Sequence, residues 1–175
     1  MVIKTNWYVV TGSPCSGKSS VIRYLSFLGY HTVASPSRTY IDVEMSKGRK
    51  IEEIRADEAD YQKRIFEMKI DQIKKLPKEN LIFFERGLPD SIAYYIFSGA
   101  NPASITEICR EIRYKGVFLL ERLPYKRDYA RVESEEGAKR LHELIRKAYL
   151  GLGYDIIEIP VKPIDERVRM ILGKI

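Results

Sequence analysis

Residues 11–20 read TGSPCSGKSS and follow the apolar run Trp7-Tyr8-Val9-Val10. Within this stretch, residues 12–19 match the pattern GxxxxGK[ST] at every fixed position. The pattern lies between a predicted strand and a predicted helix, so it indicates a loop whose backbone N–H groups bind phosphate. A plain turn between strand and helix is the alternative, and the complete match in this context argues against it.

The residue types in this loop suit a nucleotide bound together with Mg²⁺. Glycines let the backbone approach a phosphate closely, and the start of the following helix adds positive partial charge. We expect Lys18 to lie between the β- and γ-phosphates, and the hydroxyl of Ser19 to bind Mg²⁺. The residues predicted to bind the nucleotide are Gly12, Ser13, Pro14, Cys15, Ser16, Gly17, Lys18, Ser19 and Ser20.

Strands and helices alternate along the chain. Short apolar runs predict strands at about 6–11, 31–34, 81–84, 117–120 and 154–159. Helical spacing and capping residues predict helices at about 17–28, 50–76, 91–97, 101–113, 134–150 and 164–172. The stretch 50–76 is one long helix or two shorter ones, whereas 35–50 is polar and expected to be irregular. The alternation predicts one α/β domain over residues 1–175 with a largely parallel sheet.

The composition excludes several classes of protein. With 45% hydrophobic and 31% charged residues, the chain is typical of a globular domain. It has no apolar run of about 18 residues and no signal peptide pattern, so we expect no membrane span and a cytoplasmic location. Cys15 and Cys109 are too few for a disulfide framework and lack zinc-site spacing. The net charge of +6 mildly favours nucleotides or nucleic acid as partners.

A carboxylate and a guanidinium come directly after the predicted strand at 81–84. Ligands of open parallel sheets bind at the carboxyl ends of strands, so we expect Glu85 and Arg86 beside the phosphate loop. Glu85 can accept a proton from an attacking hydroxyl, or hold Mg²⁺ through water. Arg86 can bind a phosphate or the substrate. A surface salt bridge at the strand end is the structural alternative.

Two less specific segments complete the predicted site. Basic residues recur in 122–131, and arginines on a closing segment can neutralise charge on a transferring phosphoryl group. We therefore expect a lid at about 122–133 in which Arg127 and Arg131 act, with a solvated loop as the alternative. An insertion at about 35–76 is the expected acceptor side, and Arg38 and Asp90 are the candidate contacts to the acceptor.

With these residues identified, the chain resembles the AAA-domain-like family of small P-loop ATPases and kinases. This family includes ribosylnicotinamide kinase domains, and it is related to P-loop nucleoside and nucleotide kinases. The resemblance extends over nearly the whole chain and is carried by GSPCSGKSS, LGY at 28–30, FERGLPD at 84–90, LGY at 152–154, and Pro160 with Arg167. It implies a three-layer P-loop kinase fold with a five-stranded parallel sheet, ATP or GTP with Mg²⁺, and phosphoryl transfer.

Two positions depart from the family pattern. The family usually has an acidic residue at the position of Ser35, so any contact of that acid with the acceptor hydroxyl is missing. The family usually has Asp where this chain has Glu85. The Glu85-Arg86 pair is instead similar to the Glu-Arg pair of deoxynucleoside kinases, in which Glu is the base. This similarity supports Glu85 as a base and leaves the acceptor open.

The leading hypothesis is an ATP-dependent kinase that acts on a hydroxyl of a small molecule, such as a nucleoside, a nucleotide or a related metabolite. A nucleotide-dependent switch or regulatory NTPase with slow hydrolysis is the second. A polynucleotide 5′-hydroxyl kinase is the third. The positive charge allows it, but basic and acidic residues are interleaved, which argues mildly against it. The acceptor, the choice of ATP or GTP, and the oligomeric state stay open.

Overall fold

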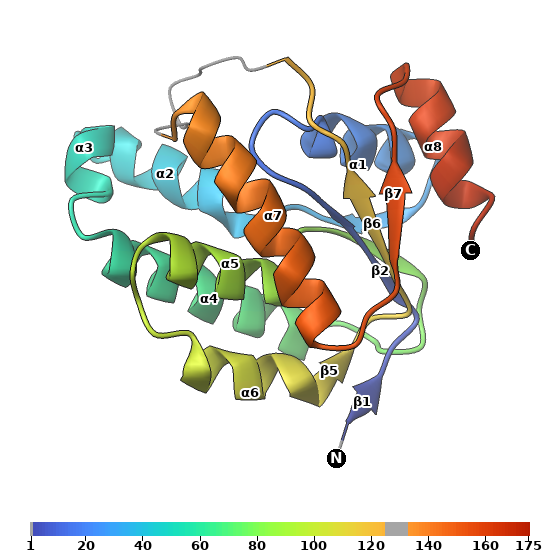
Figure 1. The fold of residues 1–175 in the computed structure, drawn as a ribbon, viewed down its shortest axis with the longest axis horizontal. Coiled ribbons are helices and arrows are strands. Elements are labelled where there is room, and N and C mark those ends of the chain that lie inside the picture. Colours follow the sequence, from blue (N-terminus) through green and yellow to red (C-terminus); the bar gives the residue numbers. More distant parts are fainter. Residues whose placement is uncertain (1, 125–132) are drawn as a thin grey trace.

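A five-stranded parallel sheet forms the centre of the protein, whose computed structural model describes residues 2–124 and 133–175 (Figure 1). The strand order is β3-β4-β2-β6-β7. The strands are β2 (Trp7–Thr11), β3 (His31–Val33), β4 (Ile82–Glu85), β6 (Gly116–Leu120) and β7 (Ile156–Ile159). The three central strands are almost completely buried, which explains why they read as continuous apolar runs in the sequence.

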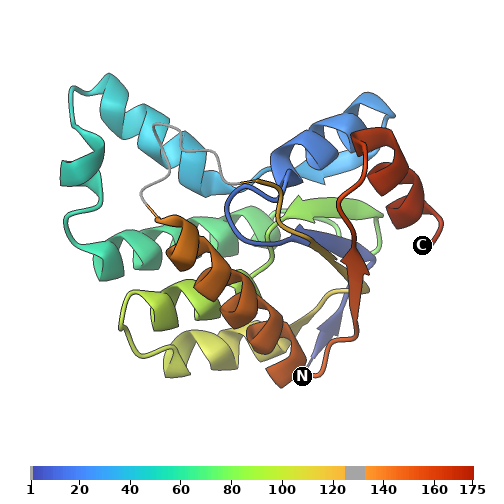
Figure 2. The same ribbon diagram turned by 45° about the horizontal axis from the view of Figure 1, so that its top comes forward.

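Helices cover both faces of the sheet, and alternate strand residues pack against each layer (Figures 1 and 2). In β2, Trp7 and Val9 face one core and Tyr8 and Val10 face the other. One layer holds α1 (Lys18–Phe27) and α8 (Ile164–Leu172). The other layer holds α4 (Glu58–Lys74), α5 (Pro89–Phe97), α6 (Ala103–Glu111) and α7 (Glu135–Gly151). The three-layer α/β fold predicted from the sequence is confirmed.

The register of the sheet brings three strand ends together. Val10 of β2 pairs with Glu85 of β4, and Thr11 of β2 pairs with Leu119 of β6. The carboxyl ends of β2, β4 and β6 therefore lie side by side at one edge of the sheet. The segments that follow these strands are the phosphate loop, residues 86–88 and the stretch beginning at 121.

The segment 35–50 was predicted to be irregular, but most of it is helical. Helix α2 (Pro36–Ser46) begins after Ser35, with Pro36 in its first turn. Its buried Ile41 packs in a small hydrophobic cluster with Ile54, Tyr61 and Ile65, named here the α2–α4 cluster. The sequence of α2 carries too few apolar residues for its helical period to stand out, so packing against α4 decides its conformation.

The stretch 50–76 forms two helices, α3 (Ile51–Ile54) and α4, in agreement with one of the two predicted alternatives. The break occurs at Asp57, whose carboxylate accepts a hydrogen bond of 2.9 Å from the backbone N–H of Asp60 and caps α4. Figure 2 shows α2 and α3 standing away from the sheet, across from α1. Within the stretch 35–76 that we predicted as an insertion, α2 and α3 thus stand away from the sheet, whereas α4 packs against one of its faces (Figure 2).

A second, two-stranded parallel sheet was not predicted. It pairs β1 (Ile3–Lys4) with β5 (Ile112–Arg113), the last residues of the helix predicted at 101–113. The hydroxyl of Thr5 donates a hydrogen bond of 3.0 Å to the carbonyl of Arg113, and the phenol of Tyr154 donates one of 3.1 Å to the carbonyl of Ile112. These contacts end α6 at Glu111 and hold the N-terminal strand against the domain.

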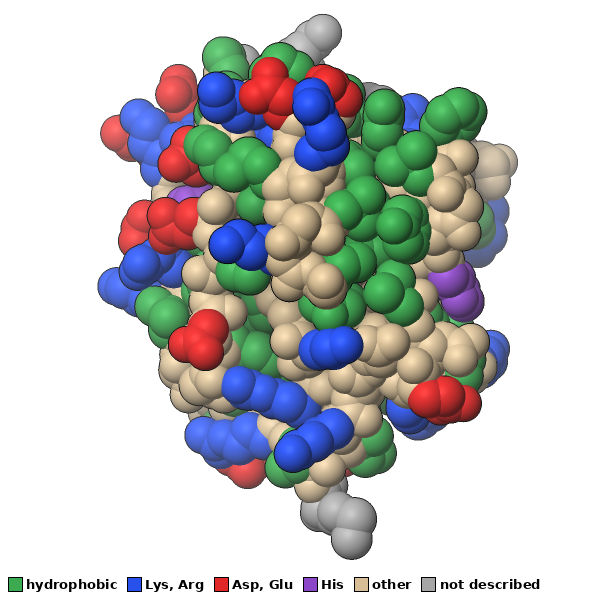
Figure 3. Space-filling model, turned by 90° about the vertical axis from the view of Figure 1, so that its right-hand side faces the viewer, with side chains coloured by type: hydrophobic (Ala, Val, Ile, Leu, Met, Phe, Trp, Pro, Cys, Tyr) green, Lys and Arg blue, Asp and Glu red, His purple; other side chains and the backbone are tan. Residues whose placement is uncertain are grey.

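The outer surface is mixed in character. On the side that carries β7 and α8, hydrophobic side chains gather in the upper right part, and Lys and Arg side chains gather in the lower part (Figure 3). Of the large hydrophobic side chains that the structure describes, Phe27 at the end of α1 is the most exposed. Within the described residues, no helix has both the length and the apolar character that crossing a lipid bilayer requires.

Four tyrosines, three of them buried and Tyr94 partly buried, predict a loss of stability in alkaline solution. Burial raises the pKa of Tyr61 to about 12, and it also raises the pKa values of Tyr94, Tyr114 and Tyr149. The folded state then keeps protons that the unfolded chain loses above about pH 10, so stability is full below that pH and falls above it. At about pH 11 each group costs about 1.4 kcal/mol. We expect the midpoint of urea unfolding to drop sharply between about pH 10 and about pH 11.5.

Two other buried groups overlap this range with opposite signs. Burial lowers the pKa of Lys69 to about 8, which adds stability as the pH rises from about 8 to about 10.5. Burial raises the pKa of Cys109 to about 12, which removes stability above about pH 9. A Tyr61→Phe variant isolates part of the tyrosine effect, because its unfolding midpoint should fall less steeply above about pH 10. A wild-type midpoint that stays constant over this range contradicts the prediction.

Candidate functional site

The phosphate loop joins β2 to α1 and has a backbone shape that depends on glycine. Gly12 and Gly17 have φ angles of 141° and 83°. A Cβ atom on Gly12 would lie 2.7 Å from Oγ of Ser16 and 2.8 Å from the carbonyl oxygen of Leu120. Cys15 also has a positive φ, 62°. The loop therefore curls tightly at the end of the sheet, as its sequence pattern predicts.

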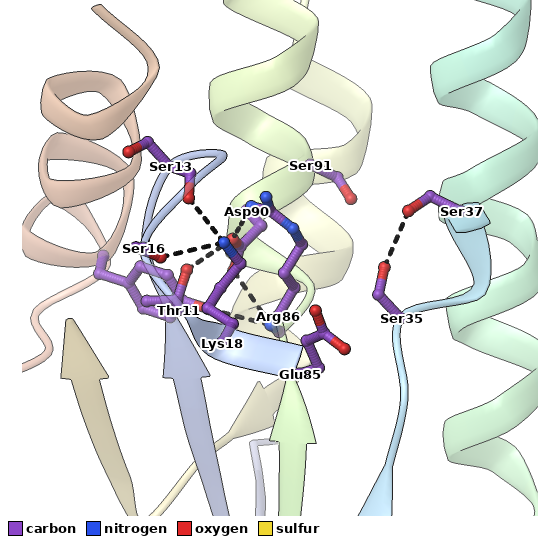
Figure 4. A network of polar contacts seen from close by, with 12 residues as sticks. Thr11, Ser13, Ser16, Lys18, Ser35, Ser37, Glu85, Arg86, Asp90 and Ser91 are labelled. Atoms are coloured by element: carbon purple, nitrogen blue, oxygen red, sulfur yellow. Dashed lines mark hydrogen bonds and ion pairs between the residues drawn. The ribbon is translucent and has the colours of Figure 1, made fainter. Parts of the chain in front are cut away.

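Lys18 folds back over this loop. Its side chain is almost fully buried, and Nζ donates hydrogen bonds of 2.6 Å to the carbonyl of Ser13 and 3.1 Å to Oγ of Ser16 (Figure 4). Oγ of Ser13 is buried and has no hydrogen-bond partner among the described residues. A buried ammonium and a buried hydroxyl beside the start of a helix are groups that phosphate oxygens can satisfy.

The two predicted metal ligands lie in contact. Oγ of Ser19, in the first turn of α1, donates a hydrogen bond of 2.6 Å to Oε1 of Glu85 at the end of β4. A hydroxyl and a carboxylate are oxygen ligands of the kind that Mg²⁺ prefers. The described part of the chain contains no group of three or more His, Cys, Asp or Glu residues that could hold a metal. A magnesium ion would therefore need phosphate and water oxygens as further ligands.

Arg86 is held by a buried aspartate. Its Nη1 donates a hydrogen bond of 3.0 Å to Oδ1 of Asp90, one helical turn further along (Figure 4). Its guanidinium carbon lies 5.1 Å from the centre of the Tyr94 ring. The backbone of Arg86 has a positive φ of 66°, which is rare for a residue with a side chain. The turn after β4 thus aims Arg86 into the space beside Glu85.

Asp90 has no exposed surface, and donors surround its carboxylate. Besides Arg86, it accepts hydrogen bonds of 2.6 Å from the hydroxyl of Thr11, 3.0 Å from the N–H of Gly87 and 2.7 Å from the phenol of Tyr149. Both carboxylate oxygens are therefore engaged inside the protein. This position argues against the direct contact with the acceptor that we predicted for Asp90. Its carboxylate instead positions Arg86.

A cavity of about 600 Å³ extends from the phosphate loop to the α2–α4 cluster. Every predicted nucleotide-binding residue lines this cavity except Gly12 and Ser13, which are buried. Glu85, Arg86 and Arg38 of α2 also line it, and the contact of Arg38 with the acceptor stays a prediction. Figure 4 shows Ser35 and Ser37 across from Glu85, away from the phosphate loop.

An arginine that no sequence motif indicated lines the cavity on the side of α2, α3 and α4, which is named here the far wall. Arg55 donates hydrogen bonds to Glu58, the shortest of 2.6 Å, and to Glu133 at 3.2 Å. Its guanidinium carbon lies 4.8 Å from the centre of the Tyr61 ring. The Arg55 and Glu133 side chains are both nearly buried, so this ion pair is shielded from solvent. It links the junction of α3 and α4 to the residue just before the Ser134 cap of α7.

Two further side chains of α4 line the cavity. Gln62 donates a hydrogen bond of 2.7 Å to Glu58. Lys69 is buried and donates hydrogen bonds of 3.0 Å to the carbonyl of Gly87 and 3.1 Å to Oγ of Ser91. No sequence motif pointed to these two polar residues. Only the packing of α4 beside the turn after β4 brings them to the site.

Arg127 and Arg131, the predicted lid arginines, lie outside the described residues. The described residues on either side of that segment are at the site. The N–H of Leu123 donates a hydrogen bond of 2.9 Å to the carbonyl of Cys15 in the phosphate loop, and Glu133 lines the cavity. The lid at 122–133 stays a prediction.

The chain is similar to a known protein family and to several solved structures. A family model described as an AAA domain matches residues 7–167. No curated protein matches the chain. Among solved structures, deoxyadenosine kinase from M. mycoides, with its products dCMP and dCDP bound, is 17% identical. It has a TM-score of 0.64, and the alignment covers 96% of this chain and 97% of that one.

Two other solved structures have higher TM-scores. The NadR protein in complex with NR is 14% identical with a TM-score of 0.70, and the alignment covers 98% of this chain but 50% of that one. The chain thus spans half of the NadR protein. Thymidylate kinase from Ehrlichia chaffeensis is 13% identical with a TM-score of 0.69, and 98% of each chain is covered. At these identities the similarity establishes the fold, that of P-loop nucleoside and nucleotide kinases.

Proposed function

The chain belongs to the AAA domain family, and on that premise we propose that it is a P-loop kinase. It transfers the γ-phosphoryl group of ATP or GTP to a hydroxyl of a small molecule, such as a nucleoside, a nucleotide or a related metabolite. One observation carries this proposal: the phosphate loop and the Glu85-Arg86 pair open onto a single cavity of about 600 Å³. That cavity has room for an acceptor as well as for phosphates.

The proposed mechanism assigns one task to each group. Lys18 and the N–H groups of the loop hold the phosphates, and Ser19 ligates Mg²⁺, which when bound draws charge from the phosphoryl oxygens. Glu85 takes the proton from the acceptor hydroxyl. The hydroxyl oxygen bonds to the γ-phosphorus while the bond from that phosphorus to the leaving nucleoside diphosphate breaks. Arg86, fixed by Asp90, stabilises charge on the transferring group.

Glu85 has a second role open to it, because its contact with Ser19 also suits a carboxylate that supports the metal through water. In the proposed enzyme, Arg127 and Arg131 close over the transferring group and exclude water. The far wall of the cavity, with Arg38, Gln62 and Tyr61, contacts the acceptor. Aromatic and amide groups on that wall support an acceptor that carries a ring with polar edges.

The test is ATP consumption with Mg²⁺ across nucleosides, nucleotides, vitamin precursors and 5′-hydroxyl oligonucleotides. We expect one small acceptor class to raise the rate well above background. Lys18→Ala should lower that rate at least about 100-fold, because the charge on the phosphates loses its ammonium partner. Lys147→Ala, on the exposed face of α7, is the matched control and should behave as wild type.

Other outcomes point elsewhere. If ATP and GTP bind but no acceptor changes the rate of hydrolysis, the protein is a regulatory NTPase or switch and the kinase proposal is wrong. If oligonucleotides alone raise the rate, and their binding weakens steeply with salt, the acceptor is a polynucleotide.

A further inference from the structure

Helix α8 contributes a buried arginine that plays no part in the proposed chemistry. Arg167 is only 2% exposed, yet its guanidinium forms no ion pair with the residues that the structure describes. Burial lowers its pKa, and Glu121 counteracts this only in part. A buried cation without a carboxylate partner is costly, so its retention calls for a specific role.

The guanidinium of Arg167 binds three separate segments of backbone. Nη1 donates a hydrogen bond of 2.7 Å to the carbonyl of Ser16 in the phosphate loop. Nη2 donates one of 2.9 Å to the carbonyl of Glu121 after β6, and Nε donates one of 2.9 Å to the carbonyl of Pro160 after β7. Arg167 therefore joins the phosphate loop to the two strand ends beside it.

The contact with Ser16 bears directly on the loop. The peptide bond between Ser16 and Gly17 is planar and trans, so its N–H points away from its carbonyl. Because Arg167 holds the carbonyl, the N–H of Gly17 is aimed in the opposite direction. A Cβ atom on Gly17 would lie 3.2 Å from Nη1, so the guanidinium also packs closely against this residue. Arg167 thus fixes the orientation of a peptide at the start of α1.

The charge of Arg167 lies close to the expected phosphates. Its partners are carbonyl dipoles, which offset a buried charge less completely than a carboxylate does. Interactions between charges are stronger in a weakly polarisable interior than in water. Anionic phosphates bound at the loop would therefore interact favourably with this guanidinium.

We propose that Arg167 is a positioning residue of the nucleotide site, which holds the Ser16–Gly17 peptide in its phosphate-binding orientation and adds buried positive charge behind the loop. The inference rests on the nucleotide-binding part of the proposed function and not on the identity of the acceptor. It gives a role to a residue that the sequence singled out only through a family resemblance.

The test compares Arg167→Gln, Arg167→Lys and wild type, with dissociation constants for ADP and inorganic pyrophosphate measured by calorimetry. Arg169→Gln is the matched control, because Arg169 lies on the exposed side of the same helix and pairs with Asp165. We expect Arg167→Gln to weaken both ligands about 10- to 100-fold. Arg167→Lys keeps the charge but cannot reach three carbonyls, so its affinity should fall in between. Arg169→Gln should stay within about two-fold of wild type.

Affinities are measured well below the unfolding temperature of each variant. A lower affinity then reports a change at the nucleotide site and not a loss of folded protein. A folded Arg167→Gln protein that binds ADP within about two-fold of wild type overturns the inference, even if its unfolding temperature is lower. If Arg167→Gln does not fold, the ADP affinity of Arg167→Lys is used instead, and a value within about two-fold of wild type overturns the inference. A wild type that binds neither ADP nor pyrophosphate instead contradicts the proposed function.

Discussion

Glu85→Gln is expected to lower the turnover of the best acceptor about 10²- to 10⁴-fold. The amide has nearly the shape of the carboxylate and can still accept the hydrogen bond from Ser19, but it cannot take a proton from the acceptor hydroxyl. ADP binding should therefore stay close to that of wild type. Steady-state turnover at saturating ATP, together with calorimetry of ADP, measures both quantities.

A surface glutamate gives the matched control for this experiment. Glu158→Gln removes a carboxylate that pairs with Arg146 on the surface, and its turnover should equal that of wild type. If Glu85→Gln keeps full turnover, Glu85 is not the base. If its turnover is restored by raising the Mg²⁺ concentration, Glu85 supports the metal, and the proton must go elsewhere.

Asp90→Ala is expected to lower the free energy of unfolding by about 3–5 kcal/mol. The variant leaves the nearly buried cation of Arg86 without its carboxylate. It also removes the acceptor for the hydroxyls of Thr11 and Tyr149 and for the N–H of Gly87. Urea unfolding at neutral pH measures the loss.

Two comparisons make the Asp90 prediction specific. Asp165→Ala removes an exposed carboxylate that pairs with Arg169, and it should leave the unfolding midpoint nearly unchanged. The double variant Asp90→Ala/Arg86→Met removes both charges of the buried pair, and should be more stable than Asp90→Ala alone. A single variant as stable as wild type would falsify the positioning role of Asp90.

The fold was largely predictable because its signals are local. The buried strands are continuous apolar runs, and the phosphate loop is a contiguous motif between a strand and a helix. Helix α2 was missed because Ile41 becomes buried only when α4 packs against it. The pairing of Ile3–Lys4 with Ile112–Arg113 was missed because each strand has only two residues, which is too short for a periodic pattern.

The sequence predicted site residues only where they lie directly at the end of a strand. Glu85 and Arg86 were found because the carboxyl ends of neighbouring parallel strands meet at one edge. The sequence shows that Asp90 is near Arg86 but not that its side chain turns into the core. Arg55 and Lys69 lie in or beside helices without a motif, and Arg167 was named only through the family resemblance. Tertiary packing brings the first two to the cavity and Arg167 to the loop.

The separate packing of the α2–α4 cluster bears on which parts of the site substitutions can reshape. Ile41, Ile54, Tyr61 and Ile65 pack with one another, apart from the two cores that hold the sheet. Substitutions in this outlying layer can reshape the far wall of the cavity while the central scaffold and the loop keep their geometry. In the proposed enzyme, substitutions in the α2–α4 cluster would therefore change the acceptor side of the cavity without changing the phosphate loop.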